Sequence, residues 1–129
     1  MSTNEASSLA LGRTFHQALV SGDWDGIRAL LHDDATWTLP GDNTISGTAD
    51  GADAVVERAQ RIAAYGLNFE LLHLLVSREN MALSLHNTAH REDAVLDEYL
   101  ATVCRLRDGK IASIETYLSD VPGMNAFFV

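Results

Sequence analysis

The stretch RLRDGKIASIETYLSD (residues 105–120) decides how this chain can fold. At its centre, Asp108-Gly109 is a strong signal for a tight hairpin turn, and apolar and polar residues alternate on both sides of it. Such alternation places successive side chains on opposite faces of a β-strand. Four runs of this kind follow one another: 68–77, 80–91, 94–107 and 110–120. The second half of the chain is therefore predicted to be an antiparallel meander.

The first half of the chain shows helical periodicity instead, with apolar residues recurring every three or four positions. Three helices are predicted: about 5–21, from Asp23 to Asp33-Asp34, and about 51–65. A strand at 35–39 follows the second helix, and the turn-rich residues 40–51 predict a long loop of the kind that often serves as a lid. Because the helices come first and most strands last, the predicted class is α+β.

The composition limits the range of functions. The chain has 129 residues, which suits a single domain over 1–129, and its hydrophobic fraction of 47% is sufficient for an ordered core. A net charge of −9 without a basic cluster disfavours nucleic acids and anionic membranes as partners. The lone Cys104 cannot form an internal disulfide, and its apolar neighbours predict a buried thiol. The N-terminal residues lack the features of a secretory signal, so a cytoplasmic protein is expected.

Three segments resemble the nuclear transport factor 2-like superfamily, and within it the SnoaL-like proteins and the ketosteroid isomerases. The segments are SGDWDGIRALLHDDATW (21–37), SGTADGADAV (46–55) and RLRDGKIASIETYLSD (105–120). The resemblance implies a cone-shaped roll, in which three N-terminal helices pack on a strongly curved, mainly antiparallel sheet and leave a deep apolar pocket. It also implies a homodimer through the outer sheet face, where alternation places Val103, Ile111 and Tyr117.

The residues that carry chemistry in steroid isomerases of this fold are absent from the matching positions. The resemblance places the base at Leu39, the oxyanion-binding tyrosine at Phe15 and the protonated aspartate at Thr102. The last carboxylate of the related epoxide hydrolases falls at Thr116. Neither standard activity is therefore expected. A histidine–aspartate pair, as in scytalone dehydratase-like members, stays open as an alternative.

Strand alternation supplies two other catalytic candidates. Thr116, Leu118 and Asp120 share one face of the last strand, which the resemblance places toward the pocket. A carboxylate at the mouth of an apolar pocket has a raised pKa, which suits Asp120 as a general acid or base; a strand or turn cap is the alternative. Asn87 is the second candidate: the resemblance places it inward, and an inward amide can orient a carbonyl or hold a water. A buried amide bonded to backbone is the alternative there.

The remaining pocket candidates are mainly apolar. The predicted substrate-binding residues are Phe15, Trp37, Leu39, Leu85, Glu98, Thr102, Thr116 and Leu118. Glu98 belongs to this set because it shares strand parity with Thr102, and a solvated strand end is the alternative. His86 and His90 would lie about 13 Å apart along a strand, too far to share one metal ion, and are expected on the outer face. No metal or organic cofactor is implied.

Two functions are compatible with these residues. The first is a cofactor-free enzyme that isomerises, cyclises or dehydrates a small apolar molecule by acid–base chemistry. The second is a non-catalytic module that binds a hydrophobic ligand or a partner protein. A polar cluster around an ordered ligand would favour the enzyme. An entirely apolar cavity, with Asp120 and Asn87 both salt-bridged or pointing to solvent, would favour the binding module.

Overall fold

The computed structural model of the protein describes residues 3–78 and 80–129. Its elements in chain order are α1 (Thr3–Ser21), α2 (Trp24–Ala29), β1 (Leu31–Leu39), β2 (Gly47–Asp50), α3 (Ala52–Ala63), β3 (Asn68–Ser77), β4 (Asn80–Arg91), β5 (Ala94–Arg107), β6 (Lys110–Leu118) and α4 (Val121–Phe127). The α+β class and the four predicted strands of the second half are confirmed. The turn predicted at Arg78-Glu79-Asn80 includes Glu79, which lies outside the described residues.

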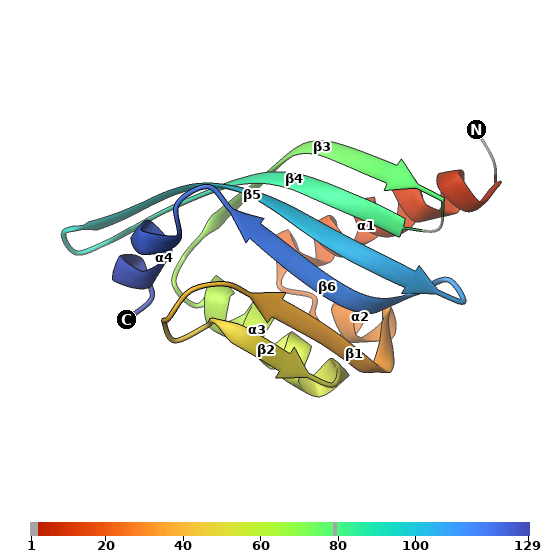
Figure 1. Ribbon diagram of the computed structural model, residues 1–129, viewed down its shortest axis with the longest axis horizontal. Helices are drawn as coiled ribbons and strands as arrows, with labels where there is room; N and C mark the ends of the chain where they lie inside the picture. The colour runs from red at the N-terminus through yellow and green to blue at the C-terminus, as the bar shows by residue number, and fades with distance from the viewer. Residues whose placement is uncertain (1–2, 79) are drawn as a thin grey trace.

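The six strands form one mixed sheet in the order β2-β1-β6-β5-β4-β3. The meander β3–β6 is antiparallel throughout, as predicted, whereas β1 pairs with β6 in parallel. Helix α1 packs on β3 and β4, and α3 packs on β1, so the N-terminal helices cover one face of the sheet (Figure 1). No helix among the described residues packs on the other face of the meander. This arrangement creates a concave space between sheet and helices.

Two elements were not predicted. Strand β2 lies inside the segment that was expected to be a loop, and Ala49 is its one buried residue. A four-residue strand with one buried position carries too little periodicity to be recognised. Helix α4 follows the last strand, where only a turn was expected. Asp120 caps it and Pro122 stands in its first turn, two signals typical of a helix start.

The start of β1 also differs from the prediction. Helix α2 ends at Ala29, and Asp33-Asp34 belong to the following strand rather than to the end of the helix. Leu31, which falls inside the predicted helix, is buried at the beginning of β1 instead. Helical and strand periodicities both place a buried residue here, so local pattern alone did not separate them.

A β-bulge near the start of β6 changes which residues face the core. Arg105 pairs with Ser113 and Leu106 with Ile111, so one residue of β6, Ala112, has no opposite partner. Ile111 and Ile114 consequently both point inward and are buried. The prediction that Ile111 lies on the outer face is therefore wrong. Tyr117, beyond the bulge, is 57% exposed on the outer face as predicted.

The buried apolar residues form two clusters. One lies between the N-terminal helices and the sheet and contains Cys104, whose predicted burial is confirmed. Burial raises the pKa of this thiol to about 12, so it behaves as a small apolar group. The second cluster joins Leu39 and Ile62 to Phe127 and Phe128 at the C-terminus. Helix α4 is thus part of the core rather than an appendage. No helix among the described residues is long and apolar enough to cross a membrane.

Candidate functional site

An internal cavity lies between the helices and the concave face of the sheet. Its volume of about 50 Å³ for a water-sized sphere exceeds the ~10–15 Å³ that a single water requires. The predicted apolar wall residues all line it: Phe15, Trp37, Leu39, Leu85 and Leu118. Among the residues that the structure describes, no Asp, Glu, His, Lys or Arg side chain lines this cavity. The space therefore suits an uncharged, mainly apolar occupant.

Further wall residues come from elements that the sequence did not reveal as pocket elements. Met124 and Phe128 approach from α4 and the residue after it, and Ala59 and Ile62 approach from α3. Ile45 comes from the segment between β1 and β2. Helix α4 and this segment close the end of the cavity, and only tertiary packing brings them there.

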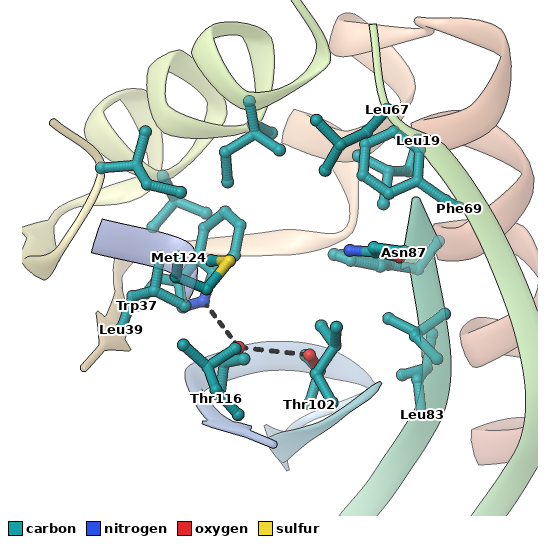
Figure 2. Close-up of a pocket in the computed structure, with 18 of the residues that line it drawn as sticks. Leu19, Trp37, Leu39, Leu67, Phe69, Leu83, Asn87, Thr102, Thr116 and Met124 are labelled. Atoms are coloured by element: carbon teal, nitrogen blue, oxygen red, sulfur yellow. Dashed lines mark hydrogen bonds between the residues drawn. The ribbon is translucent and has the colours of Figure 1, made fainter. Parts of the chain in front are cut away.

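Three of the polar groups in the cavity are bonded to one another. The Trp37 Nε1–H donates to Thr116 Oγ1 at 3.0 Å, and the hydroxyls of Thr116 and Thr102 lie 3.1 Å apart (Figure 2). Both threonines were predicted to face the pocket, and both are buried in its wall. Because each partner comes from a different strand, this chain of bonds links β1, β6 and β5 across the cavity floor.

Asn87 is the exception among the polar wall residues. It projects from β4 into the cavity, as the family resemblance implied (Figure 2). The side chain is only 7% exposed, and its Oδ1 atom has no hydrogen-bond partner among the described residues. The alternative interpretation was a buried amide bonded to the backbone. For this oxygen, that alternative is wrong.

Arg58 is a residue near the site that the sequence did not reveal. It is 8% exposed on α3 and donates to the backbone carbonyls of Trp37 at 2.7 Å and Ser46 at 3.3 Å. Its guanidinium lies 5.4 Å from the centroid of the Trp37 ring. Burial, followed by the nearby Arg61, lowers the pKa of Arg58. We infer that Arg58 fixes Trp37 and the following loop in the cavity wall.

Asp120 does not lie where it was predicted. The alternation of β6 ends at Leu118, and Asp120 is exposed at the N-terminus of α4, outside the cavity wall. Its carboxylate accepts the Gly123 N–H at 3.0 Å, which is the capping arrangement considered as the alternative. The prediction that this carboxylate faces the pocket is therefore wrong, because β6 ends at Leu118, two residues before Asp120.

Glu98 is the buried carboxylate nearest to the site in the sheet. It is 1% exposed and stands opposite Asn87 in the β4–β5 register, but it is not part of the cavity wall. One of its oxygens accepts the Asp120 N–H at 2.6 Å and the Ser119 hydroxyl at 3.4 Å. Desolvation by burial raises the pKa of Glu98, and these hydrogen bonds oppose the rise. Glu98 is therefore directed inward, as predicted, but it does not contact the cavity, which was also predicted.

Glu98→Gln is expected to change how stability depends on pH. The folded protein retains the Glu98 proton to higher pH than the unfolded chain, in which the pKa of the glutamate is near 4.5. The stability contributed by this group is therefore complete below that value and is lost as the pH rises through the raised pKa. Urea denaturation across this range should show a smaller loss of unfolding free energy in the variant. Glu92→Gln, in an exposed turn, should retain the wild-type slope; equal slopes in all three proteins would contradict the prediction.

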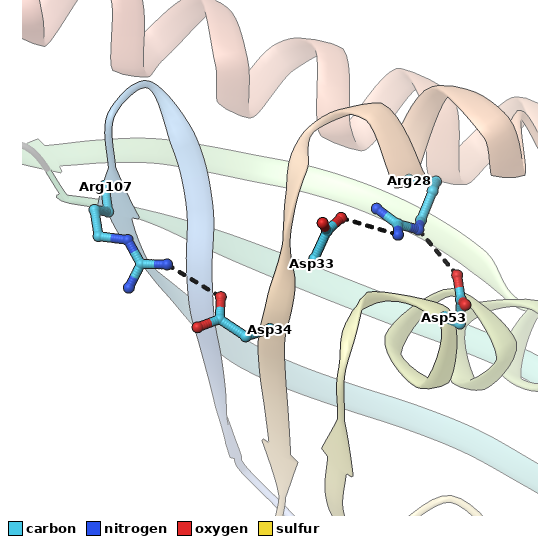
Figure 3. Close-up of polar contacts among 5 residues, drawn as sticks. All are labelled: Arg28, Asp33, Asp34, Asp53 and Arg107. Atoms are coloured by element: carbon cyan, nitrogen blue, oxygen red, sulfur yellow. Dashed lines mark hydrogen bonds and ion pairs between the residues drawn. The ribbon is translucent and has the colours of Figure 1, made fainter.

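The paired carboxylates at the start of β1 lie outside the cavity. Arg28 bonds Asp33 at 3.1 Å and Asp53 at 2.9 Å, and Arg107 bonds Asp34 at 3.0 Å (Figure 3). These pairs tie α2, β1, α3 and β5 together at the surface. All three carboxylates are largely exposed, so solvent screens the pairs and each contributes little to stability.

The histidines of β4 lie on the outer face, as predicted. His86 bonds Asp97 at 2.6 Å and Glu70 at 3.4 Å, and its ring stacks on Tyr99. These bonds, with Asp97 the stronger, raise the pKa of His86. Within residues 3–78 and 80–129, no group of three or more His, Cys, Asp or Glu side chains is arranged to hold a metal ion.

Comparison with known proteins gives a consistent result. The family model of the SnoaL-like domain matches residues 12–114. The structure of Bal32a, from a soil-derived mobile gene cassette, has a TM-score of 0.93 at 24% identity, covering 98% of this chain and all of that one. An NTF2-like protein from Burkholderia xenovorans has a TM-score of 0.83 at 18% identity, covering 97% and 98%.

A third solved structure carries a description of activity. This candidate ketosteroid isomerase from Kribbella flavida has a TM-score of 0.77 at 19% identity and covers 92% of this chain and 82% of its own. At such identities the likeness shows a shared fold and no more. No curated protein matches the chain at a significant level.

Proposed function

Because the chain belongs to the SnoaL-like domain family, we propose that it binds a small, uncharged and largely apolar molecule in its internal cavity. The observation that carries this proposal is the wall itself, which is apolar apart from Asn87 and the bonded Trp37, Thr102 and Thr116. A charged ligand would lose its hydration there without gaining an ion-pair partner. The position of Asp120 in solvent also favours binding over catalysis by that residue.

The experiment compares indole with indole-3-carboxylate, a relative of similar size that carries a negative charge. Each compound is titrated into isotopically labelled protein, and amide chemical shifts around the cavity report binding. Indole is expected to bind, and the carboxylate at least about tenfold more weakly, because burying an unpaired charge costs several kcal/mol. The proposal fails if indole leaves the cavity resonances unchanged or if the carboxylate binds as tightly.

Acid–base catalysis is a second candidate, favoured by one observation. Glu98 is a buried carboxylate with a raised pKa, and it is the sheet neighbour of Asn87. We propose it, in place of Asp120, as the group that would exchange a proton in an isomerisation, cyclisation or dehydration without a metal or organic cofactor. The Kribbella flavida neighbour is consistent with isomerase chemistry on this fold.

A ketone of indole size tests the catalytic proposal. Because Glu98 does not line the cavity, in D₂O it would remove an α-proton from 2-indanone through one bound water and leave an enolate, which then takes up a deuteron derived from solvent. Proton NMR should show faster exchange with wild-type protein than in buffer, and Glu98→Gln should abolish the acceleration. Exchange that matches the buffer rate with wild-type protein would remove this candidate and leave the binding proposal intact.

The outer sheet face is proposed as a homodimer interface. Leu75, Tyr99 and Tyr117 are each more than half exposed there, with exposed fractions of 56%, 54% and 57%. They come from three strands of the meander, so they place large exposed side chains across its outer face. A second copy of the chain would bury the same surface on both partners around a two-fold axis.

Light scattering coupled to size exclusion tests the dimer. We expect twice the mass of the 129-residue chain at micromolar concentration, and a single-chain mass for Tyr117→Glu, which would bury a charge in the interface. Val20→Glu changes an exposed residue of α1 and should leave the mass of the dimer unchanged. A single-chain mass for the wild-type protein would refute the interface.

A further inference from the structure

The Asn87 amide is the one polar wall group whose bonding is incomplete in the described structure. Its oxygen has no partner, although the side chain is more than nine-tenths buried. By contrast, the other polar wall groups are hydrogen-bonded to one another. The Trp37 side chain bonds Thr116, and the Thr116 hydroxyl bonds the Thr102 hydroxyl. The lack of a partner is therefore specific to one position and is not a general property of the wall.

An unpaired buried amide oxygen lowers the stability of a folded protein, because it gives up hydration without a replacement bond. The strand offers no structural reason for the amide. The other inward residues of β4 are apolar: Met81, Leu83, Leu85 and Ala89 are all buried beside it. A leucine at position 87 would continue that row and would fill the wall without an orphan acceptor. The amide is thus a cost to folding that a bound molecule would recover.

From this contrast we infer that the cavity is built for a neutral ligand whose hydrogen-bond donor, a hydroxyl or a ring N–H, faces Asn87. The body of that ligand is apolar, because most of the cavity wall, including Leu67, Phe69 and Leu85, consists of side chains without polar atoms. The donor is a single, directed group rather than a cation, since no carboxylate lines the cavity within the described residues. This inference rests on the proposed binding function and adds the chemical class of the ligand to it.

Three bicyclic molecules of nearly equal shape separate the possibilities. Indole carries an N–H donor, benzofuran carries a ring-oxygen acceptor in the same position, and indene carries neither. Their dissociation constants are measured with wild-type protein by the chemical shifts of cavity residues. Indole is expected to bind about tenfold more tightly than indene or benzofuran, which corresponds to one hydrogen bond completed inside the protein.

Asn87→Leu links this preference to the amide. The variant is expected to bind all three molecules within about twofold of one another, because its wall offers no acceptor. Its melting temperature is expected to rise, since the orphan oxygen is gone. Thr88→Val, on the opposite face of the same strand, is the matched control and should keep the preference for indole. If the leucine does not fit, Asn87→Val makes the same comparison with a smaller side chain.

A spectroscopic readout separates direct bonding from a change in shape. The N–H proton of ¹⁵N-labelled indole should move downfield on binding to the wild-type protein and to Thr88→Val. It should not do so on binding to Asn87→Leu. This signal reports the hydrogen bond itself and does not depend on affinity.

The outcomes distinguish this inference from the function on which it rests. If none of the three molecules binds, the proposed binding function fails. If they bind equally well, or if benzofuran binds best, the cavity binds apolar molecules but the donor assignment is overturned. A preference for indole that survives in Asn87→Leu would also overturn it, because another group would then supply the acceptor.

Discussion

Replacing Phe127 with alanine is expected to lower the free energy of unfolding by about 3–5 kcal/mol. The side chain is 1% exposed on α4 and belongs to the cluster that contains Leu39, Ile62 and Phe128. Its removal leaves an internal void, because the neighbours on β1 and α3 are held by the sheet and the helix and cannot collapse into it. A loss of this size would consume a large part of the stability of a domain of this length.

Urea denaturation of Phe127→Ala measures the effect, and Val129→Ala is the control. Val129 lies two residues away but is 68% exposed, so its truncation should change the unfolding free energy by less than about 0.5 kcal/mol. Similar small effects from both variants would mean that α4 is not part of the cooperative core. The helix closes the end of the cavity, so the Phe127 variant should also bind indole more weakly.

Ala59→Phe is expected to abolish binding of indole to the cavity, with an affinity loss of more than about tenfold, or ~1.4 kcal/mol. Ala59 is 3% exposed, lies on α3 and lines the cavity directly. A benzyl group at this position would occupy the space that the ligand needs. The cavity can accept part of the added ring, so the cost to folding should stay within the ~1–3 kcal/mol typical of overpacking.

Gln60→Phe is the matched control, because it adds the same ring to the exposed side of the same helix. It should bind indole as the wild-type protein does, measured by the same titration. Thermal unfolding of both variants shows whether each is folded under the conditions of the titration. Unchanged binding in a folded Ala59→Phe protein would place the indole site elsewhere on the molecule.

The candidate site could be predicted only in part. Alternation within β4, β5 and β6 sorted the side chains into two faces, and the family resemblance indicated that Asn87, Thr102 and Thr116 face the cavity, which all three line. The same rule failed for Asp120, since it assumed that β6 continued beyond Leu118. Arg58 carried no recognisable signal, because its backbone partners lie in distant segments.

Local pattern determined most of the secondary structure. Period-two alternation and the Asp108-Gly109 turn were sufficient to predict the meander, and helical periodicity was sufficient to predict α1 and α3. These signals are local, because they depend on residues within one or two turns of the chain. They also supported the family to which the chain belongs.

Tertiary structure decided the remaining features. The parallel pairing of β1 with β6 depends on contacts between distant segments. The bulge at Ala112, which turns Ile111 inward, lies in the β5–β6 hairpin and interrupts the alternation on which the prediction relied. The docking of α4 on β5 set the end of the cavity, placed Asp120 in solvent and left Glu98 buried beneath the turn. The sequence by itself therefore determined the strands and which of their faces are apolar. Packing determined where those strands end, because the free energy that selects these ends comes from non-local burial. The strand ends in turn determine which polar side chains reach the cavity.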